Sequence, residues 1–283
     1  EHDAPAAAIW QREQEAVANL PAGLSKLPTD TLLLQPVNMV GVSALKGLLD
    51  TRPEALPLPV TNIQYTPENL SLSGLVKDIA RSEYGLIMLM GKGGVGKTTM
   101  AAAIAVRLAD MGFDVHLTTS DPAAHLSTTL NGSLKNLQVS RINPHDETER
   151  YRQHILETKG GDLDEAGKRL LEEDLRSPCT EEIAVFQAFS RIIQEAGKQF
   201  VVMDTAPTGH TLLLLDATGA YHREIARLAG EHGQPVLTPM MRLQDSEQTK
   251  VLIATLAETT PVLEAAHLQD DLRRAGIEPW GWV

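Results

Sequence analysis

The sequence predicts an α/β fold with a doubly wound, mostly parallel sheet and a helical insertion. Short apolar runs at residues 86–90, 114–119 and 199–203 are typical of buried strands, and helical stretches alternate with them. Residues 145–176 are charged and helical in composition, which predicts an insertion over one end of the sheet. Because sheets of this kind bind ligands at the carboxyl ends of their strands, the residues that follow each run are candidates for a site.

The first 84 residues are predicted to lie outside this sheet. Prolines recur at positions 53, 57 and 59 without apolar periodicity, which indicates a linker. We therefore expect three parts: residues 1–50, a linker at 51–84, and an α/β domain at 85–283. The elements expected before the domain are helices at residues 6–20, 42–49 and 71–80 and a strand at 31–35.

Composition narrows the class of protein. The net charge of −12 over 283 residues argues against non-specific binding to nucleic acid, so no nucleic-acid partner is expected. The single cysteine, Cys179, excludes an intrachain disulfide and a CxxC metal site, and it favours a reducing, cytoplasmic compartment. Apolar runs are far shorter than the ~20 residues of a membrane span, and the polar Glu1-His2-Asp3 start is unlike a signal peptide.

Residues 91–98 carry the strongest motif in the chain. They read Gly-Lys-Gly-Gly-Val-Gly-Lys-Thr, match the pattern G-x-x-x-x-G-K-[ST], and lie between an apolar strand and an Ala-rich helix at 99–109. Glycines let the backbone turn its N–H groups toward an anion, and the helix adds its positive end. Lys97 can reach the β- and γ-phosphates, and the Thr98 hydroxyl can ligate Mg²⁺. The expected nucleotide-binding residues are Gly91, Lys92, Gly93, Gly94, Val95, Gly96, Lys97, Thr98 and Thr99.

The alternative interpretation is a glycine-rich turn without a ligand, but the complete motif in its strand–helix context favours a nucleotide site and the fold of a P-loop NTPase. Lys92 has its own alternative, since an exposed loop lysine would satisfy the pattern equally well. No Asn-Lys-x-Asp motif, which would read guanine, occurs in the chain, so ATP is favoured over GTP.

Two aspartates follow predicted strands. Asp204 stands where P-loop enzymes place the aspartate that holds Mg²⁺, although an ordinary strand-ending aspartate is the alternative. Asp121 lies in a Ser-Asp-Pro sequence and could orient or deprotonate the attacking water. It could equally cap a helix, and spacing alone leaves both roles open.

Three stretches together resemble the arsenite-transporting ATPase family, a group of deviant Walker-A P-loop ATPases. They are residues 91–99, Ser-Asp-Pro-Ala at 120–123, and Asp-Thr-Ala-Pro-Thr-Gly-His-Thr at 204–211. The resemblance covers roughly residues 85–283 and is greatest to the second half of a bacterial arsenical-pump ATPase with two tandem halves. Residues 1–50 are similar to the tail of a preceding half, so the chain is expected to be a fragment that is truncated at its C-terminus.

The resemblance implies ATP hydrolysis that is stimulated by As(III) or Sb(III) and drives a membrane efflux protein. It implies a cytoplasmic protein that associates with the inner membrane through that partner. Within the site it implies that Asp121 acts at the water and that Lys92 contacts nucleotide across a pseudo-dimer formed with the second ATPase half. Residues 120–125 and 204–211 would be the two switches.

Cys179 is the main candidate for recognising the transported ion. Ser177 is predicted as the N-cap of a helix with Pro178 in its first turn, and Cys179 follows them. Soft thiolates suit soft metalloid ions, but a lone cysteine is more often a small buried hydrophobe. The resemblance implies that Cys179, His210 and Ser177 contact the metalloid. Since one cysteine cannot supply three thiolates, further ligands are expected from the other half. His210 by itself would be interpreted as a structural histidine.

Three other functions compete with this interpretation. A tail-anchored-protein targeting ATPase shares these switches but usually carries a CxxC zinc site, which is absent here. An ATPase that positions chromosomes or septa on DNA or membrane is disfavoured by the acidic balance. A nucleotide-binding regulatory module without turnover is the non-enzymatic alternative.

Overall fold

A computed structural model describes residues 4–24, 26–30, 32, 40–49, 71–121, 134–161, 163–206, 218 and 238–283. The chain divides into two compact units, residues 1–62 and 63–283. The first unit contains helices α1 (Ala4–Ala18) and α2 (Val42–Leu49), which confirms both helices expected there. Of the strand expected at 31–35, only Leu32 belongs to the described residues, so that prediction is not tested.

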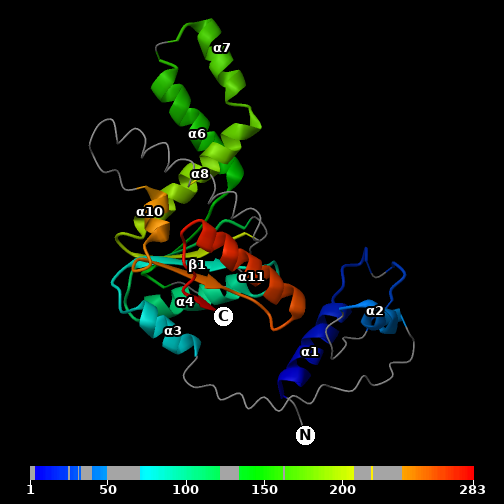
Figure 1. Ribbon diagram of the computed structural model, residues 1–283. Coiled ribbons are helices and arrows are strands. Elements are labelled where there is room, and N and C mark those ends of the chain that lie inside the picture. The colour runs from blue at the N-terminus through cyan, green and yellow to red at the C-terminus, as the bar shows by residue number, and fades with distance from the viewer. Residues whose placement is uncertain are drawn as a thin grey trace. The chain divides into compact units, whose positions relative to one another are not determined.

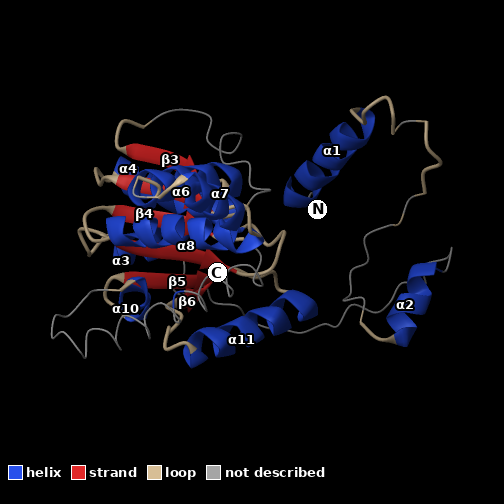
Figure 2. Cartoon of the chain, turned by 90° about the horizontal axis from the view of Figure 1, so that it is seen from above, coloured by secondary structure: helices blue, strands red, loops and turns tan. Residues whose placement is uncertain are grey.

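In the second unit the described strands form a six-stranded sheet, and each of their pairings is parallel. The strand order is β3-β2-β4-β1-β5-β6, and helices lie on both faces (Figure 2), so the predicted doubly wound α/β class is confirmed. The strands are β1 (Gly85–Met90), β2 (Val115–Thr119), β3 (Leu137–Arg141), β4 (Phe200–Asp204), β5 (Thr249–Ile253) and β6 (Gly281–Trp282).

The helices of this unit divide between the two faces of the sheet and the insertion. In Figure 1, α3 and α4 lie on one side of the sheet, and α6 and α7 project beyond it, where the helical insertion was predicted. The described helices are α3 (Leu72–Ile79), α4 (Lys97–Asp110), α6 (Pro144–Lys159), α7 (Glu165–Asp174), α8 (Pro178–Glu195), α10 (Pro239–Gln244) and α11 (Thr259–Arg274). None of the helices in the described ranges is long and apolar enough to cross a bilayer.

Alternation along β1 explains why the sheet has two hydrophobic cores. All six β1 residues are buried. Leu86 and Met88 pack on one face with side chains of α8, α10 and α11, whereas Ile87 and Leu89 pack on the other with α3 and α4. A strand that is covered on both faces must be apolar throughout, which is the pattern of residues 86–90.

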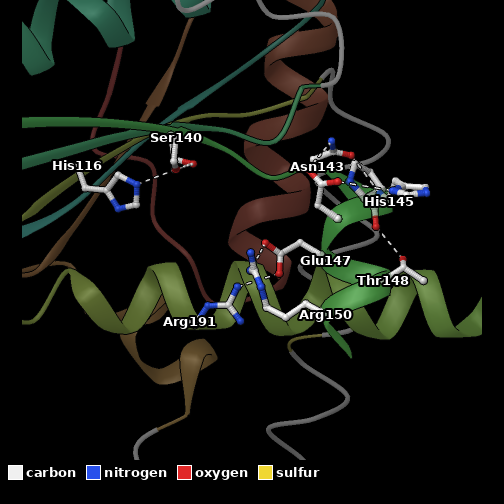
Figure 3. A network of polar contacts seen from close by, with 11 residues as sticks. His116, Ser140, Asn143, His145, Glu147, Thr148, Arg150 and Arg191 are labelled. Atoms are coloured by element: carbon white, nitrogen blue, oxygen red, sulfur yellow. Dashed lines mark hydrogen bonds and ion pairs between the residues drawn. The ribbon is translucent and has the colours of Figure 1, made fainter. Parts of the chain in front are cut away.

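Polar contacts fix α8 against the sheet and against α6 (Figure 3). His116 on β2 is buried, its Nε2 lies 2.7 Å from Ser140 Oγ on β3, and its Nδ1 lies 2.7 Å from Glu195 Oε2 at the end of α8. On α6, the Glu147 carboxylate accepts hydrogen bonds from Arg150 on the same helix and from Arg191 on α8. The insertion is therefore anchored to the sheet through α8.

Candidate functional site

The loop between β1 and α4 runs against the end of β5. Gly91 has φ +144°, and a Cβ at this position would fall 2.2 Å from the Ala254 carbonyl oxygen, so no side chain fits. Gly94 and Gly96 also have positive φ, at +81° and +92°, and Gly96 is the N-cap of α4. The helix begins at Lys97, two residues before the expected start. Left-handed glycines at a helix N-terminus make an anion-binding cradle of backbone N–H groups.

Lys97 is folded back over this loop. Its side chain is only 5% exposed, and Nζ donates a hydrogen bond to the Lys92 carbonyl oxygen at 2.9 Å. Burial lowers the pKa of Lys97, while the nearby carboxylates of Asp204 and Asp121 oppose that shift. The ammonium therefore lies over the cradle. Among the described residues it has one hydrogen-bond acceptor, a neutral carbonyl oxygen, which a phosphate oxygen can replace.

Asp204 lies at the carboxyl end of β4, between the ends of β1 and β2. In register it stands opposite Leu89 on one side and Thr119 on the other. Asp204 is fully buried, and its Oδ2 accepts hydrogen bonds from Thr98 Oγ1 at 2.7 Å and from Thr119 Oγ1 at 3.2 Å. Its Oδ1 is buried and has no hydrogen-bond partner among the residues that the structure describes. Burial raises the pKa of Asp204, and the two threonine hydroxyls and Lys97 partly offset this rise.

An unpartnered buried carboxylate oxygen is costly, because burial removes its water without supplying a donor. A divalent cation would satisfy it. Mg²⁺ prefers oxygen ligands and is usually held by one or two carboxylates together with substrate phosphates. Asp204 Oδ1 is a carboxylate oxygen and Thr98 Oγ1 is a hydroxyl oxygen, so both are oxygen ligands of the kind that Mg²⁺ prefers. They lie beside the loop that can bind phosphate, so these residues fit the metal.

The segments that follow β2 and β4 are joined to each other. Ser120 donates its backbone N–H to the Asp204 carbonyl oxygen at 3.0 Å, and Ser120 Oγ accepts the N–H of Ala206 at 3.1 Å. The Asp121 N–H donates to Thr119 Oγ1 at 3.0 Å. Asp121 is thus connected through the Thr119 hydroxyl to Asp204, and the two aspartates that follow predicted strands converge at one edge of the sheet.

Lys92 extends away from the centre of the loop. Its Nζ lies 2.9 Å from Glu264 Oε1 on α11. Both side chains are partly exposed, at 39% for Lys92 and 41% for Glu264. The sequence placed Lys92 beside the phosphates, whereas in this structure its charge is paired with a carboxylate of the same chain.

The candidate metalloid residues belong to different elements. Ser177 is the N-cap of α8, as predicted, and its Oγ accepts the Cys179 N–H at 3.2 Å. Cys179 is exposed, so the alternative of a small buried hydrophobe is wrong. His210, and with it most of the predicted switch at 204–211, lies outside the described residues, as do positions 122–125 of the other switch.

Sequence reasoning missed two side chains that complete the site. Thr119 was recognised only as the end of a strand, although a hydroxyl at the carboxyl end of a buried strand is a signal for contact with the next strand end. Glu264 gives no signal, because it is one of several carboxylates in an amphipathic helical stretch.

A family model described as anion-transporting ATPase matches residues 84–273 of the 283-residue chain. The chain belongs to the anion-transporting ATPase family. The match covers residues 91–98 (the phosphate loop), both strand-end aspartates and Glu264. The geometry described above is therefore that of a family member.

Relatives within this family share most of the sequence. A protein of Acidiphilium multivorum named arsenical pump-driving ATPase is 88% identical over 283 residues, which is 100% of this chain and 48% of that protein. An Escherichia coli protein of the same name is 82% identical over 281 residues, 99% of this chain and 48% of its own length. ATPase GET3 of Paracoccidioides lutzii is 29% identical over 159 residues, 50% of this chain and 46% of that protein. The chain therefore spans about half the length of the first two relatives.

Proposed function

We propose that this chain binds and hydrolyses MgATP as part of an ATPase that drives arsenite or antimonite efflux. The observation that carries the proposal is the arrangement around Asp204. One carboxylate oxygen accepts both threonine hydroxyls, and the other is buried beside the phosphate loop with no partner in the described part of the chain. The close relatives named as arsenical pump-driving ATPases support the transport part of the proposal.

In this proposal each part of the loop has one task. The backbone N–H groups of residues 91–98 and the Lys97 ammonium bind the β- and γ-phosphates. Asp204 and Thr98 hold Mg²⁺, directly or through water, and the metal when bound neutralises charge on the transferred phosphoryl group. Val95 and the loop glycines would contribute backbone N–H groups, and Thr99 lies in the first turn of α4.

Asp121 is proposed to act on the attacking water. The water oxygen bonds to the γ-phosphorus while the bond from that phosphorus to the β–γ bridging oxygen breaks, which yields ADP and phosphate; Asp121 orients the water and accepts its proton. The coupling of Asp121 to Asp204 through Thr119 supports this role.

The metalloid is proposed to bind at the start of α8, as substrate and activator. The Cys179 thiol is exposed there, next to the Ser177 hydroxyl, and thiolate sulfur is the protein ligand that soft ions prefer. We propose that His210 and ligands from the second ATPase half complete the site. The same half would bring nucleotide and Lys92 together across a pseudo-dimer. A membrane efflux protein is the proposed partner, and a cytoplasmic location at the inner membrane is proposed with it.

The decisive experiment measures ATP hydrolysis with and without antimonite in a protein that carries both halves. We expect antimonite to stimulate the rate, and Cys179→Ser to remove the stimulation while unstimulated turnover remains. Glu182→Gln, at an exposed position of the same helix, is the matched control and should retain stimulation. Lys97→Ala should abolish Mg²⁺-dependent ATP binding altogether.

The alternatives give different results in the same assay. A rate that antimonite does not change in the unmodified protein would favour a targeting ATPase related to GET3 or a positioning ATPase. Binding of MgATP without any turnover would favour a regulatory module. ATP affinity that survives Lys97→Ala would overturn the nucleotide site itself.

A further inference from the structure

We infer that Glu264 is a positioning residue for Lys92: it holds the lysine on α11 in the nucleotide-free chain, and bound triphosphate must take the lysine from it. The inference rests on the proposed function in one respect, namely that the ligand of the loop is MgATP. It assigns a role to Glu264 and a resting position to Lys92.

The first support is the position of Glu264 relative to the loop. Lys92 Nζ donates to Glu264 Oε1 at 2.9 Å, although 172 positions separate the two residues in the chain. The fold brings them together, because β1, which leads into Lys92, pairs with β5, which leads into α11. The Ala254 N–H donates to the Met90 carbonyl oxygen at 2.7 Å, and the Ala254 oxygen lies against Gly91. The segment that leads into α11 is therefore fixed to the segment that leads into Lys92.

The second support is the direction in which Lys92 extends. In the strand order, β4 with Asp204 lies on one side of β1, and β5 lies on the other. Lys97, whose ammonium lies over the loop, binds the Lys92 carbonyl oxygen and so fixes the backbone of Lys92. The Lys92 side chain extends from this fixed point to α11, on the β5 side. The two lysines of the motif are thus separated, one over the loop and one on the neighbouring helix.

The third support is the strength of the pair. Both side chains are about two-fifths exposed, and exposed ion pairs are weak because water screens them. A triphosphate carries several negative charges, and lysine binds phosphate as a point charge. The phosphates can therefore compete for Lys92 without any rearrangement of α11. Because the ion pair is weak, Glu264 reduces the fraction of Lys92 that is available to phosphate but does not block it permanently.

The first test measures the resting pair without nucleotide. Lysines of the 283-residue chain are acetylated briefly with an N-hydroxysuccinimide ester, and modification at each position is quantified by mass spectrometry. We expect Glu264→Gln to raise modification of Lys92 by about twofold or more relative to the exposed Lys198, because the ammonium loses its carboxylate partner. Asp270→Asn removes the same charge from an exposed position of the same helix and should leave Lys92 unchanged.

The second test measures MgATP affinity in a double-mutant cycle, in a protein that carries both ATPase halves, because Lys92 is proposed to meet nucleotide across the pseudo-dimer. Glu264→Gln should tighten binding by up to about fivefold, because the phosphates no longer compete with a weak ion pair. In a Lys92→Met background the same substitution should have no effect, because there is no lysine to release. Asp270→Asn should bind MgATP as the unmodified chain does.

Either of two results would overturn the inference. One is Lys92 modification that is the same in Glu264→Gln and in the unmodified chain. The other is Glu264→Gln affinity that is unchanged, or that increases equally with and without Lys92, since equal increases would mean only that a negative charge was removed from near the site. The first test uses no ATP, so failure of the nucleotide proposal would leave its outcome readable.

Discussion

At the scale of single residues, the buried Asp204 carboxylate lowers the free energy of unfolding until a ligand binds. This carboxylate is desolvated, and no described residue donates a hydrogen bond to one of its oxygens. The raised pKa of Asp204 expresses the same cost, because burial disfavours the charged form. Functional residues are often held in environments that reduce stability until the ligand binds.

We therefore predict that Asp204→Asn stabilises the unliganded protein while abolishing its response to MgATP. The amide oxygen can still accept from Thr98 and Thr119, and the buried charge is gone. We expect a gain of about 1 kcal/mol in the free energy of unfolding at neutral pH. Urea denaturation with and without MgATP measures both effects. A variant that is less stable than the unmodified protein, or that is still stabilised by MgATP, would contradict the prediction.

The pH dependence of this gain has a definite sign. Because the pKa of Asp204 is raised on folding, the folded state retains this proton over a range in which the unfolded state has lost it. The stability contributed by Asp204 therefore falls as pH rises from about 4, the ordinary aspartate value, through the raised folded pKa. The difference between Asp204→Asn and the unmodified protein should be small at the acid end and should grow to a plateau at neutral pH.

The sequence predicted part of this residue chemistry. Asp204 and Thr98 were expected to face each other, because a strand-end aspartate and a phosphate loop must converge at the carboxyl edge of a parallel sheet. Thr119 and Glu264 were not expected to take part. Their roles depend on which strands and helices become neighbours, and that is a property of the tertiary fold.

At the scale of elements, the phosphate loop approaches the end of β5 closely. Substitutions at two loop glycines can show whether this close approach limits stability. A Cβ at Gly91 meets the Ala254 carbonyl oxygen at 2.2 Å, whereas a Cβ at Gly94 meets nothing within 4 Å. Both residues have positive φ. Alanine at either position is therefore strained in its backbone, but only at Gly91 does it also push two elements apart.

We predict that Gly91→Ala lowers the free energy of unfolding by about 4 kcal/mol, the range of severe backbone and packing defects. Gly94→Ala is the matched control and should cost about 1–2 kcal/mol, the penalty of a left-handed residue with a side chain. Denaturant titration of both variants measures the difference. Equal losses would mean that β5 yields to the added methyl group and that the approach is not a constraint.

Sequence reasoning missed two strands and a helix because each of them has a weak or misleading sequence pattern. Strand β3 is at the edge of the sheet, and each of its five residues is half-buried or exposed, so its apolar signal is weak. Strand β5 carries a partly exposed lysine among buried residues. Helix α11 has Pro261 near its start, which resembles a helix breaker, although proline is tolerated in the first turn. Central strands β1, β2 and β4 are buried at every position and were recognised.

At the scale of the whole molecule, the described groups of the proposed nucleotide site belong to one of the two units. The phosphate loop, both aspartates and Glu264 all lie within residues 63–283. We predict that a chain lacking residues 1–62 keeps the MgATP affinity of the full chain. Isothermal titration of the two chains makes the comparison. Loss of binding in the shorter chain would show that residues 1–62 supply part of the nucleotide site.

Helix α8 places the proposed metalloid cysteine and the anchoring of the sheet at opposite ends of one rigid body. Its 18 residues span about 27 Å at 1.5 Å per residue. Cys179 stands in its first turn, and Glu195, its last residue, contacts His116 on β2. Strand β2 ends at Thr119, directly before Ser120 and Asp121. A helix of this length transmits a tilt along its axis with little bending. A ligand bound to the Cys179 sulfur would therefore shift the strand that leads into Asp121, the aspartate proposed to act on water, without contacting that aspartate itself.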